Sequence, residues 1–396
     1  MLLVCVAALT GCGKSTPPRA SVGGAVGAVA EASGASGVAT KNTVRLGDSD
    51  PASDAAAVAR AIYPGVTPAS RPQAVVLVDE RNWTASLAAA SLASAPLGAP
   101  LLYSDGETLP HVSAATLEAL HPGGAAAVGG AQVIRVGTSA AVPGGYRTYA
   151  VPSGEPAAVA AAIERIMSVA RGAAPRQVIV TAADGPPALA MPAAGLSAES
   201  GAPILFVTAT GVPAATAALL SSLHRPTIYA VGPSAISARA LAALARLGRV
   251  VPIAVSPPSE RDSPAANAIA VSRFADGSFG WGIHEAGHGL VFALASDPLA
   301  APAAAALSAH GDYAPLLLLE SSTSIPPTLS GYLGDVQPGY NASAPPVRGF
   351  YNHGWLIGSS ISVVVQAEID SLLEISPSKT PGKATVEEEP SASLAE

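Results

Sequence analysis

The sequence predicts an α/β fold made of three similar modules, each with a parallel sheet. Short apolar runs typical of strands alternate with Ala-rich stretches typical of helices, which is the pattern of βαβ units. One apolar run occurs in three similar copies, "GAPLLYS" at 98–104, "GAPILFVT" at 201–208 and "YAPLLLLE" at 313–320. Repetition at nearly equal intervals favours three duplicated modules over one continuous doubly wound sheet.

Each copy extends over a full structural unit. A strand-like run lies upstream of the shared proline at an equal distance in all copies, and a hydrophobic residue followed by proline lies downstream, ahead of a helical stretch. A further strand follows and ends in glycine. In the third copy this glycine lies farther from the shared proline, which indicates an insertion within 334–350. In chain order the positions are Val76, Pro100, Leu109-Pro110 and Gly129; Ile179, Pro203, Val212-Pro213 and Gly232; and Val291, Pro315, Ile325-Pro326 and Gly358.

Another helical stretch precedes each unit, at 52–62, 156–170 and 263–274. Strands that are covered by helices on both faces read as nearly continuous apolar runs and are parallel, which is what these sequences predict. The modules are therefore expected at 43–143, 144–254 and 255–376.

Residues 1–12 predict a lipoprotein signal. The apolar run "MLLVCVAA" is followed by "LTGC", which resembles the bacterial lipobox, and Cys12 would be the acylated residue. The letters "GKST" that follow do not make a phosphate-binding loop, because Ala8 stands at its first glycine position and two prolines follow where a helix should begin. The Gly/Ala/Ser/Pro-rich stretch 13–42 is typical of a flexible linker. We expect an extracytoplasmic protein anchored to the membrane by a lipid on Cys12.

The composition limits the classes of function. The chain has 396 residues, of which 12% are charged, with a net charge of -7 and no Lys/Arg-rich block, so nucleic acid is not an expected partner. Both cysteines, Cys5 and Cys12, precede the modules, which therefore contain no disulfide and no thiolate metal site. No G-x-G-x-x-G motif follows a strand, so no dinucleotide cofactor is expected. The Pro/Ser/Glu-rich segment 377–396 predicts a disordered tail.

The first module carries a family resemblance. The stretch "VVLVDERNWTASLAAASLASAPLGAPLLYSDGETLP", preceded by "VRLGDSDPASDAAAVARA" and followed by "AAAVGGAQVI", is similar to the cell wall-binding repeat type 2, which characteristically occurs in threes. The resemblance covers residues 43–376. It implies Rossmann-like modules packed around a pseudo-threefold axis, and non-covalent binding of anionic polymers of the bacterial cell wall.

The candidate binding residues follow from this resemblance and from the geometry of parallel sheets. Ligands of such sheets bind at the carboxyl ends of the strands, so the loops after Val78, Leu102, Thr181, Leu205 and Leu317 are the expected contact region. The Asn-Phe-Pro-Asp-Ala-Leu stretch of the family appears here in changed form, as "NWTASL", "DGPPAL" and "DPLAAP". The candidates are Asn82, Pro100, Leu101, Leu102, Asp184, Pro203, Ile204, Leu205, Asp297, Pro315, Leu316 and Leu317.

One short motif suggests an enzyme. "HEAGH", from His284 to His288, has the H-E-x-x-H spacing that binds zinc when it lies on a helix, with Glu285 as general base. The repeat alignment instead places it in a loop that enters a strand, where residues four apart do not share a face. No metal and no catalytic residue are therefore expected.

Together these observations predict a non-catalytic lipoprotein of the cell envelope. Its three repeats would bind cell-wall glycopolymer, or a glycan associated with peptidoglycan, without a cofactor. Two alternatives stay open: a zinc-dependent envelope hydrolase that uses residues 284–288, and a scaffold that has lost polymer binding.

Overall fold

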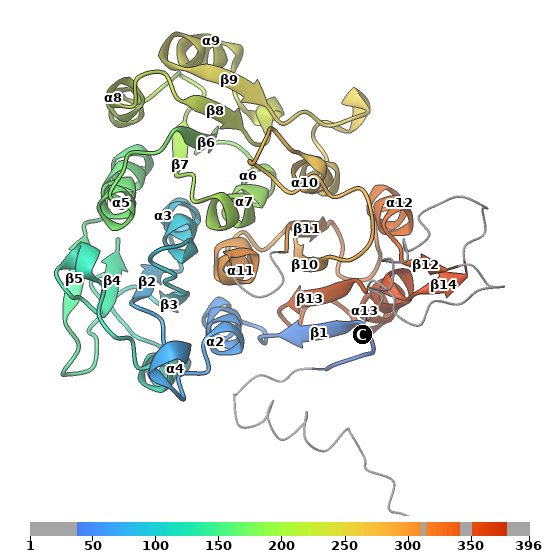
Figure 1. The fold of residues 1–396 in the computed structure, drawn as a ribbon, viewed down its shortest axis with the longest axis horizontal. Helices are drawn as coiled ribbons and strands as arrows, with labels where there is room; N and C mark the ends of the chain where they lie inside the picture. Colours follow the sequence, from blue (N-terminus) through green and yellow to red (C-terminus); the bar gives the residue numbers. More distant parts are fainter. Residues whose placement is uncertain (1–37, 310–313, 341–350, 378–396) are drawn as a thin grey trace, which may run out of the picture.

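The computed structural model describes residues 38–309, 314–340 and 351–377, which Figure 1 colours along the chain. The lipidation site at Cys12, residues 13–37 of the predicted linker and residues 378–396 of the predicted tail lie outside the described residues. The predicted fold class is confirmed, because three four-stranded parallel sheets are interleaved with helices. None of the described helices combines the length and hydropathy that crossing a membrane requires.

The first sheet has the strand order β3-β2-β4-β5. Its strands are β2 (Val75–Asp79), β3 (Leu101–Ser104), β4 (Val133–Val136) and β5 (Thr148–Val151). The chain passes from β2 to β3 through α3 (Trp83–Ala89) and the short helix η2 (Ala90–Ala93), and from β3 to β4 through α4 (His111–Leu120) and η3 (Ala126–Val128). All three strand pairs are parallel.

The second sheet repeats this topology, with the order β7-β6-β8-β9. Its strands are β6 (Gln177–Ala182), β7 (Ile204–Val207), β8 (Thr227–Ala230) and β9 (Arg249–Pro252). The helices are α6 (Pro187–Ala190), α7 (Pro192–Ser200), α8 (Ala214–Ser222) and α9 (Ala238–Leu247). The repeat extends to side chains, because Thr216 donates to the carbonyl of Phe206 just as Ser113 donates to that of Tyr103, both at 2.7 Å.

The third sheet takes its fourth strand from the start of the chain. Its order is β1-β13-β10-β11. The strands are β10 (Gly289–Leu294), β11 (Leu316–Leu319), β13 (His353–Ile357) and β1 (Thr43–Leu46). The helices are α11 (Ala300–Ala309), α12 (Pro327–Asp335) and α13 (Val363–Leu373), and a small pair is formed by β12 (Gly339–Tyr340) and β14 (Ser376–Pro377).

The pairing of β1 corrects the predicted module boundaries. Residues 43–46 were expected in the first module, but they pair in parallel with residues 354–357 and close the chain into a ring (Figure 1). The side chain of Arg45 explains the preference, since its guanidinium is buried and donates to the carbonyl of Gly358 at 2.7 Å and to Gln366 at 3.0 Å. The first sheet in turn extends past residue 143 to include β5.

The predicted flexible linker also ends earlier than expected. The backbone N–H of Asn42 donates to the carboxylate of Asp370 at 2.7 Å, and the amide of the same asparagine donates to Glu374 at 3.1 Å. Thr40 also donates to Asp370, and Lys41 pairs with Glu374. Residues 40–42 are therefore fixed on helix α13 and belong to the third module.

Three equivalent helices connect the sheets. They are α2 (Pro51–Ile62), α5 (Pro156–Arg171) and α10 (Pro264–Arg273), close to the three helical stretches predicted from the sequence. Each begins with proline in its first turn, where the missing N–H costs no hydrogen bond. Each packs on the edge strand of the following module, β3, β7 or β11, and on a central helix of the preceding one, so the three modules share one arrangement.

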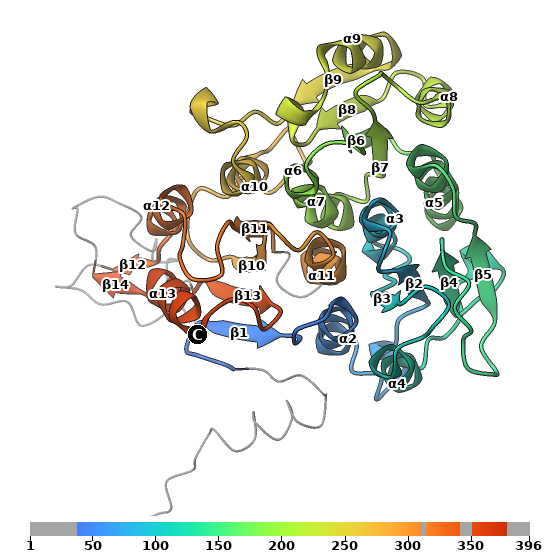
Figure 2. The same ribbon diagram turned by 180° about the vertical axis from the view of Figure 1, so that it is seen from behind.

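The central helices α3, α7 and α11 meet at the middle of the ring, as both Figure 1 and Figure 2 show. Small residues make this possible: from Ala300 to Ser308 every residue of α11 is buried, and six of these nine are alanine. A helix that is buried all round needs such a surface to approach two neighbours closely. One hydrophobic core therefore runs through all three modules.

Replacing Gly195 by leucine is expected to destabilise the protein by about 1–3 kcal/mol, through overpacking of the contact between α7 and α11. A Cβ at this position would lie 2.8 Å from the Ser308 hydroxyl oxygen and 3.5 Å from the ring of Trp281. Urea unfolding measures the change, and Gly331→Leu on α12 is the matched control, because a Cβ there meets nothing within 4 Å. Equal losses in both variants would contradict close packing at the centre.

Candidate functional site

The predicted apolar contact residues lie inside the sheets. Every one is buried, and exposure of the hydrophobic side chains does not exceed the 4% of Leu101. The three prolines precede strands β3, β7 and β11, which are the edge strands, where proline removes no ladder hydrogen bond. Their carbonyls accept hydrogen bonds from the neighbouring central strands at 2.9–3.0 Å. These side chains are core residues without access to an external polymer: Pro100, Leu101, Leu102, Pro203, Ile204, Leu205, Pro315, Leu316 and Leu317.

The three polar candidates lie in equivalent loops, each after the first strand of its module. Asn82 caps helix α3 by accepting from the backbone of Ala85 at 3.0 Å. Asp184 accepts from the backbone of Ala209 at 2.8 Å. Asp297 accepts from the backbone of Leu299 at 3.1 Å, and burial raises the pKa of its carboxyl. Asn82 and Asp297 thus hold their own loops, whereas Asp184 joins its loop to the one that follows β7.

The loops at the carboxyl ends of the strands are strongly acidic. Helices begin there, and the positive ends of their dipoles favour carboxylates. Asp50 caps α2 in this way, and Glu320 accepts from Ser263 at the start of α10 at 2.7 Å. Apart from the buried Asp54, the acidic residues of these loops and first helical turns are Asp48, Asp50, Asp79, Glu80, Asp105, Glu107, Glu155, Asp184, Glu260, Asp262, Asp297 and Glu320.

This charge is unfavourable for the expected contact with an anionic polymer. Arginines also occur in these loops, but Arg81 pairs with Asp105 and Arg261 pairs with Asp262. An anionic polymer that approached the carboxyl ends would therefore meet carboxylates of its own sign. The prediction that the loops after Val78, Leu102, Thr181, Leu205 and Leu317 bind such a polymer disagrees with the charge found there.

The opposite edge of the sheets, at the amino ends of the strands, carries most of the arginines. Helices end there, and Arg60, Arg171, Arg246 and Arg273 each stand in a last helical turn, where the dipole favours cations. Others lie in loops before strands, and they are Arg71, Arg147, Arg176 and Arg225. No local pattern in the sequence marks this edge, because its arginines are isolated along the chain and meet only in the fold.

The "HEAGH" motif lies in a loop, as the repeat alignment predicts. Residues 284–288 are not helical and lead directly into β10. The loop is fixed by Asn352, which accepts from the backbone of Gly287 at 2.9 Å and of His288 at 3.2 Å. Burial lowers the pKa of His288, while Glu285 opposes this shift. The helical context that gives the motif its zinc-binding geometry is missing, and the described residues contain no group of three His, Cys, Asp or Glu that could hold a metal ion.

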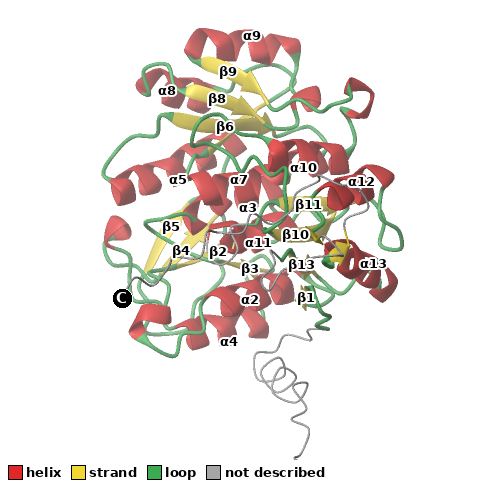
Figure 3. Cartoon of the chain, turned by 45° about the vertical axis from the view of Figure 1, so that its right-hand side comes forward, coloured by secondary structure: helices red, strands yellow, loops and turns green. Residues whose placement is uncertain are grey.

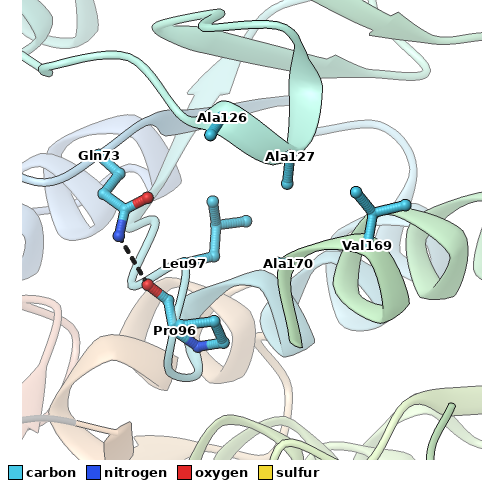
Figure 4. Close-up of a pocket in the computed structure, with 7 residues that line it drawn as sticks. All are labelled: Gln73, Pro96, Leu97, Ala126, Ala127, Val169 and Ala170. Atoms are coloured by element: carbon cyan, nitrogen blue, oxygen red, sulfur yellow. Dashed lines mark hydrogen bonds between the residues drawn. The ribbon is translucent and has the colours of Figure 1, made fainter. Parts of the chain in front are cut away.

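A pocket of about 360 Å³ opens at the amino end of the first sheet (Figure 4). It lies between the loops before the strands and the end of α5, and Gln73 donates from its amide to the carbonyl of Pro96 at 2.8 Å. The remaining lining residues are apolar and include Leu97 and Val169. No charged side chain lines this pocket, so it offers nothing to recognise an anionic group.

Comparison with known proteins identifies the fold. The chain is similar to the solved structures of Cwp6 and Cwp8 from Clostridium difficile, with TM-scores of 0.63 and 0.62 at 17% and 18% identity. In both cases 84% of this chain is covered, and it spans about half of the other, 48% of Cwp6 and 52% of Cwp8. No known family description and no curated protein matches the sequence.

Proposed function

We propose that this protein is a non-catalytic component of the bacterial cell envelope that binds an anionic cell-wall glycopolymer without forming a covalent bond. The observation that carries the proposal is the likeness, over 84% of the chain, to the cell wall proteins Cwp6 and Cwp8. The resemblance of the three modules to the cell wall-binding repeat supports the same role. The lipobox-like sequence before Cys12 supports attachment to the outer surface of the membrane.

The arrangement of the chain supports a binding role over catalysis. The motif with the clearest enzymatic spacing, at 284–288, lies in a loop that Asn352 holds in place. A non-covalent ligand of a weakly charged protein would be held by a few exposed cations, and its affinity would fall with salt.

The purified protein is expected to be retained on isolated cell walls at low salt and released as the salt concentration rises. Retention should fall on walls from which the anionic polymers have been removed by acid, because the cationic side chains then lose their partner. The amount of protein in the wall pellet measures both effects. Failure to sediment with intact walls at low salt would overturn polymer binding and would favour a scaffold without this activity.

A further inference from the structure

The amino-terminal edge of the second sheet gathers exposed cations from separate parts of the sequence. Residue 176 precedes β6, residues 224 and 225 precede β8, residue 246 lies in the last turn of helix α9, and residue 249 begins β9. All five side chains are exposed. We call this surface the basic edge, and its residues are Arg176, His224, Arg225, Arg246 and Arg249.

Backbone hydrogen bonds place these residues side by side. The N–H of Thr227 donates to the carbonyl of Arg176 at 3.0 Å, and the N–H of Arg249 donates to the carbonyl of Pro226, also at 3.0 Å. The strands β6, β8 and β9 therefore begin at the same level of the sheet, and neighbouring strands are about 4.8 Å apart. Figure 3 shows β6, β8 and β9 as arrows that point the same way, so their starting residues share one end of the sheet.

Most of this charge is not neutralised by the protein. Arg249 pairs with Asp276, and the carboxylate of Asp276 also accepts a hydrogen bond from the hydroxyl of Tyr229 at 3.0 Å. Within the described residues no carboxylate lies within 4.0 Å of the guanidinium groups of Arg176, Arg225 or Arg246. Among the described residues, three guanidinium groups of the basic edge therefore lack a carboxylate partner, and that of Arg225 donates to the carbonyl of Arg246 at 3.5 Å, in a protein whose net charge is -7.

Helix capping does not account for this arrangement. Arg246 stands in the last turn of α9, where a cation is expected, but Arg176 and Arg225 lie outside the helices. His224 and Arg225 follow the C-cap of α8 and are both in the left-handed region, with φ of 54° and 65°; His121 ends α4 in the same conformation, so only the second left-handed residue, Arg225, is particular to this edge. Such a conformation costs a non-glycine residue on the order of 1 kcal/mol, so Arg225 is held in place by its surroundings.

We propose that the basic edge binds the phosphate or carboxylate groups of a polyanion. The proposal rests on the proposed function and names the surface that carries it, at the opposite end of the strands from the acidic loops. Guanidinium groups suit this task, because their planar fork of donors matches the oxygens of a phosphate or carboxylate in a bidentate geometry. Arg176, Arg225 and Arg249 stand at or just before the starts of adjacent strands, so a chain of repeating anionic units can contact more than one of them at once.

The test compares two triple variants with the same change in net charge. In the first, Arg176→Gln, Arg225→Gln and Arg246→Gln remove the unpaired cations of the basic edge. In the control, Arg81→Gln, Arg239→Gln and Arg261→Gln remove three exposed arginines at the carboxyl ends of strands, including Arg239 at the other end of helix α9. Exposed ion pairs contribute little to stability, so both variants are expected to fold, which circular dichroism checks.

Titration calorimetry with inorganic polyphosphate at about 50 mM salt gives the primary readout. We expect the unaltered protein to bind, the basic-edge variant to bind at least about tenfold more weakly and with a shallower dependence on salt, and the control to bind as before. No binding by the unaltered protein, full binding by the basic-edge variant, or an equal loss in both variants would overturn the proposal.

Isolated cell walls give a second readout that separates this proposal from the proposed function. Loss of retention in the basic-edge variant alone supports both. Retention of all three proteins on walls supports wall binding and overturns the basic edge as its site. Selective loss of polyphosphate binding, with no protein retained on walls, supports the anion site and overturns the wall polymer as its ligand.

Discussion

Replacing Arg171 by methionine is expected to lower the free energy of unfolding by about 3 kcal/mol. Arg171 ends helix α5, and its guanidinium donates to the carboxylate of Glu164 at 2.6 Å and to the carbonyl of Gly201. The Glu164 side chain is only 1% exposed, and its second oxygen is buried without a hydrogen-bond partner. Removal of the arginine would leave a buried carboxylate with the Ser168 hydroxyl, at 2.6 Å, as its remaining hydrogen-bond partner.

The cost arises from the unpaired charge more than from the lost attraction. Burial raises the pKa of Glu164, while the hydrogen bond from Ser168 and the charge of Arg171 oppose this rise. Without Arg171 the carboxyl must either stay charged in an apolar surrounding or take up a proton, and both states are less stable than the pair. The effect is large because α5 connects the first and second modules and packs on α3, α8 and β7.

A double-mutant cycle separates the two contributions. Glu164→Leu combined with Arg171→Met replaces the pair by apolar groups, and we expect this variant to recover most of the stability lost in Arg171→Met, because no buried charge remains. Urea unfolding followed by circular dichroism measures all four proteins. A loss below about 1 kcal/mol in Arg171→Met, or a double variant no more stable than that single variant, would show that Glu164 is not held as a buried anion.

Fold class could be predicted from sequence because it depends on patterns repeated along the chain. The prolines before β3, β7 and β11 and the apolar runs after them occur three times, and each copy forms the same edge strand. The pairing of β1 with the third sheet instead of the first could not be predicted in this way. Its four residues, "TVRL", read as a strand in any sheet, and only the buried contacts of Arg45 with Gly358 and Gln366 decide which sheet they join.

The candidate site was harder to predict for a physical reason. The leucines of the repeated runs are well marked in the sequence because they form the core, and for the same reason they cannot reach a ligand. The cations of the basic edge leave no local pattern, since Arg176 and Arg249 are 73 residues apart and become neighbours only through β8. A signal was available in the loops, where arginine stands just before three different strands.

Asp54 lies where the third module meets the first, a contact that we call the seam and that is formed by α2 and the ends of β1 and β13. It stands in the first turn of α2, is 3% exposed, and lies close to Gly47 and Gly358, which directly follow β1 and β13. One carboxylate oxygen accepts from the backbone N–H of Asp48 at 3.0 Å. Burial raises the pKa of Asp54 to about 8, against the hydrogen bond from Asp48 and with the help of the negative charges of Asp297, Asp50 and Asp48.

This shift makes the stability of the protein depend on pH. In the unfolded chain the carboxyl loses its proton near pH 4, whereas in the folded protein it keeps the proton until about pH 8. Between these values the folded state binds more protons, so raising the pH favours unfolding. The free energy of unfolding should fall, on account of this group, by up to about 1.4 kcal/mol for each pH unit from pH 4 to pH 8.

Asp54→Asn is therefore expected to stabilise the protein, by an amount that is small near pH 4 and reaches a few kcal/mol at pH 8. The other modules show that a neutral residue fits: the equivalent positions after the first proline of α5 and α10 are Val159 and Asn267, and the Asn267 amide donates to the carbonyl of Ser263 at 2.9 Å. In the variant the new amide can donate likewise to the carbonyl of Asp50, while its oxygen keeps the bond from Asp48. Thermal unfolding of both proteins from pH 4 to pH 8 measures the difference, which must grow with pH. A constant difference, or a variant less stable than the parent at pH 8, would show that the seam holds Asp54 as a carboxylate and that its charge helps to close the ring.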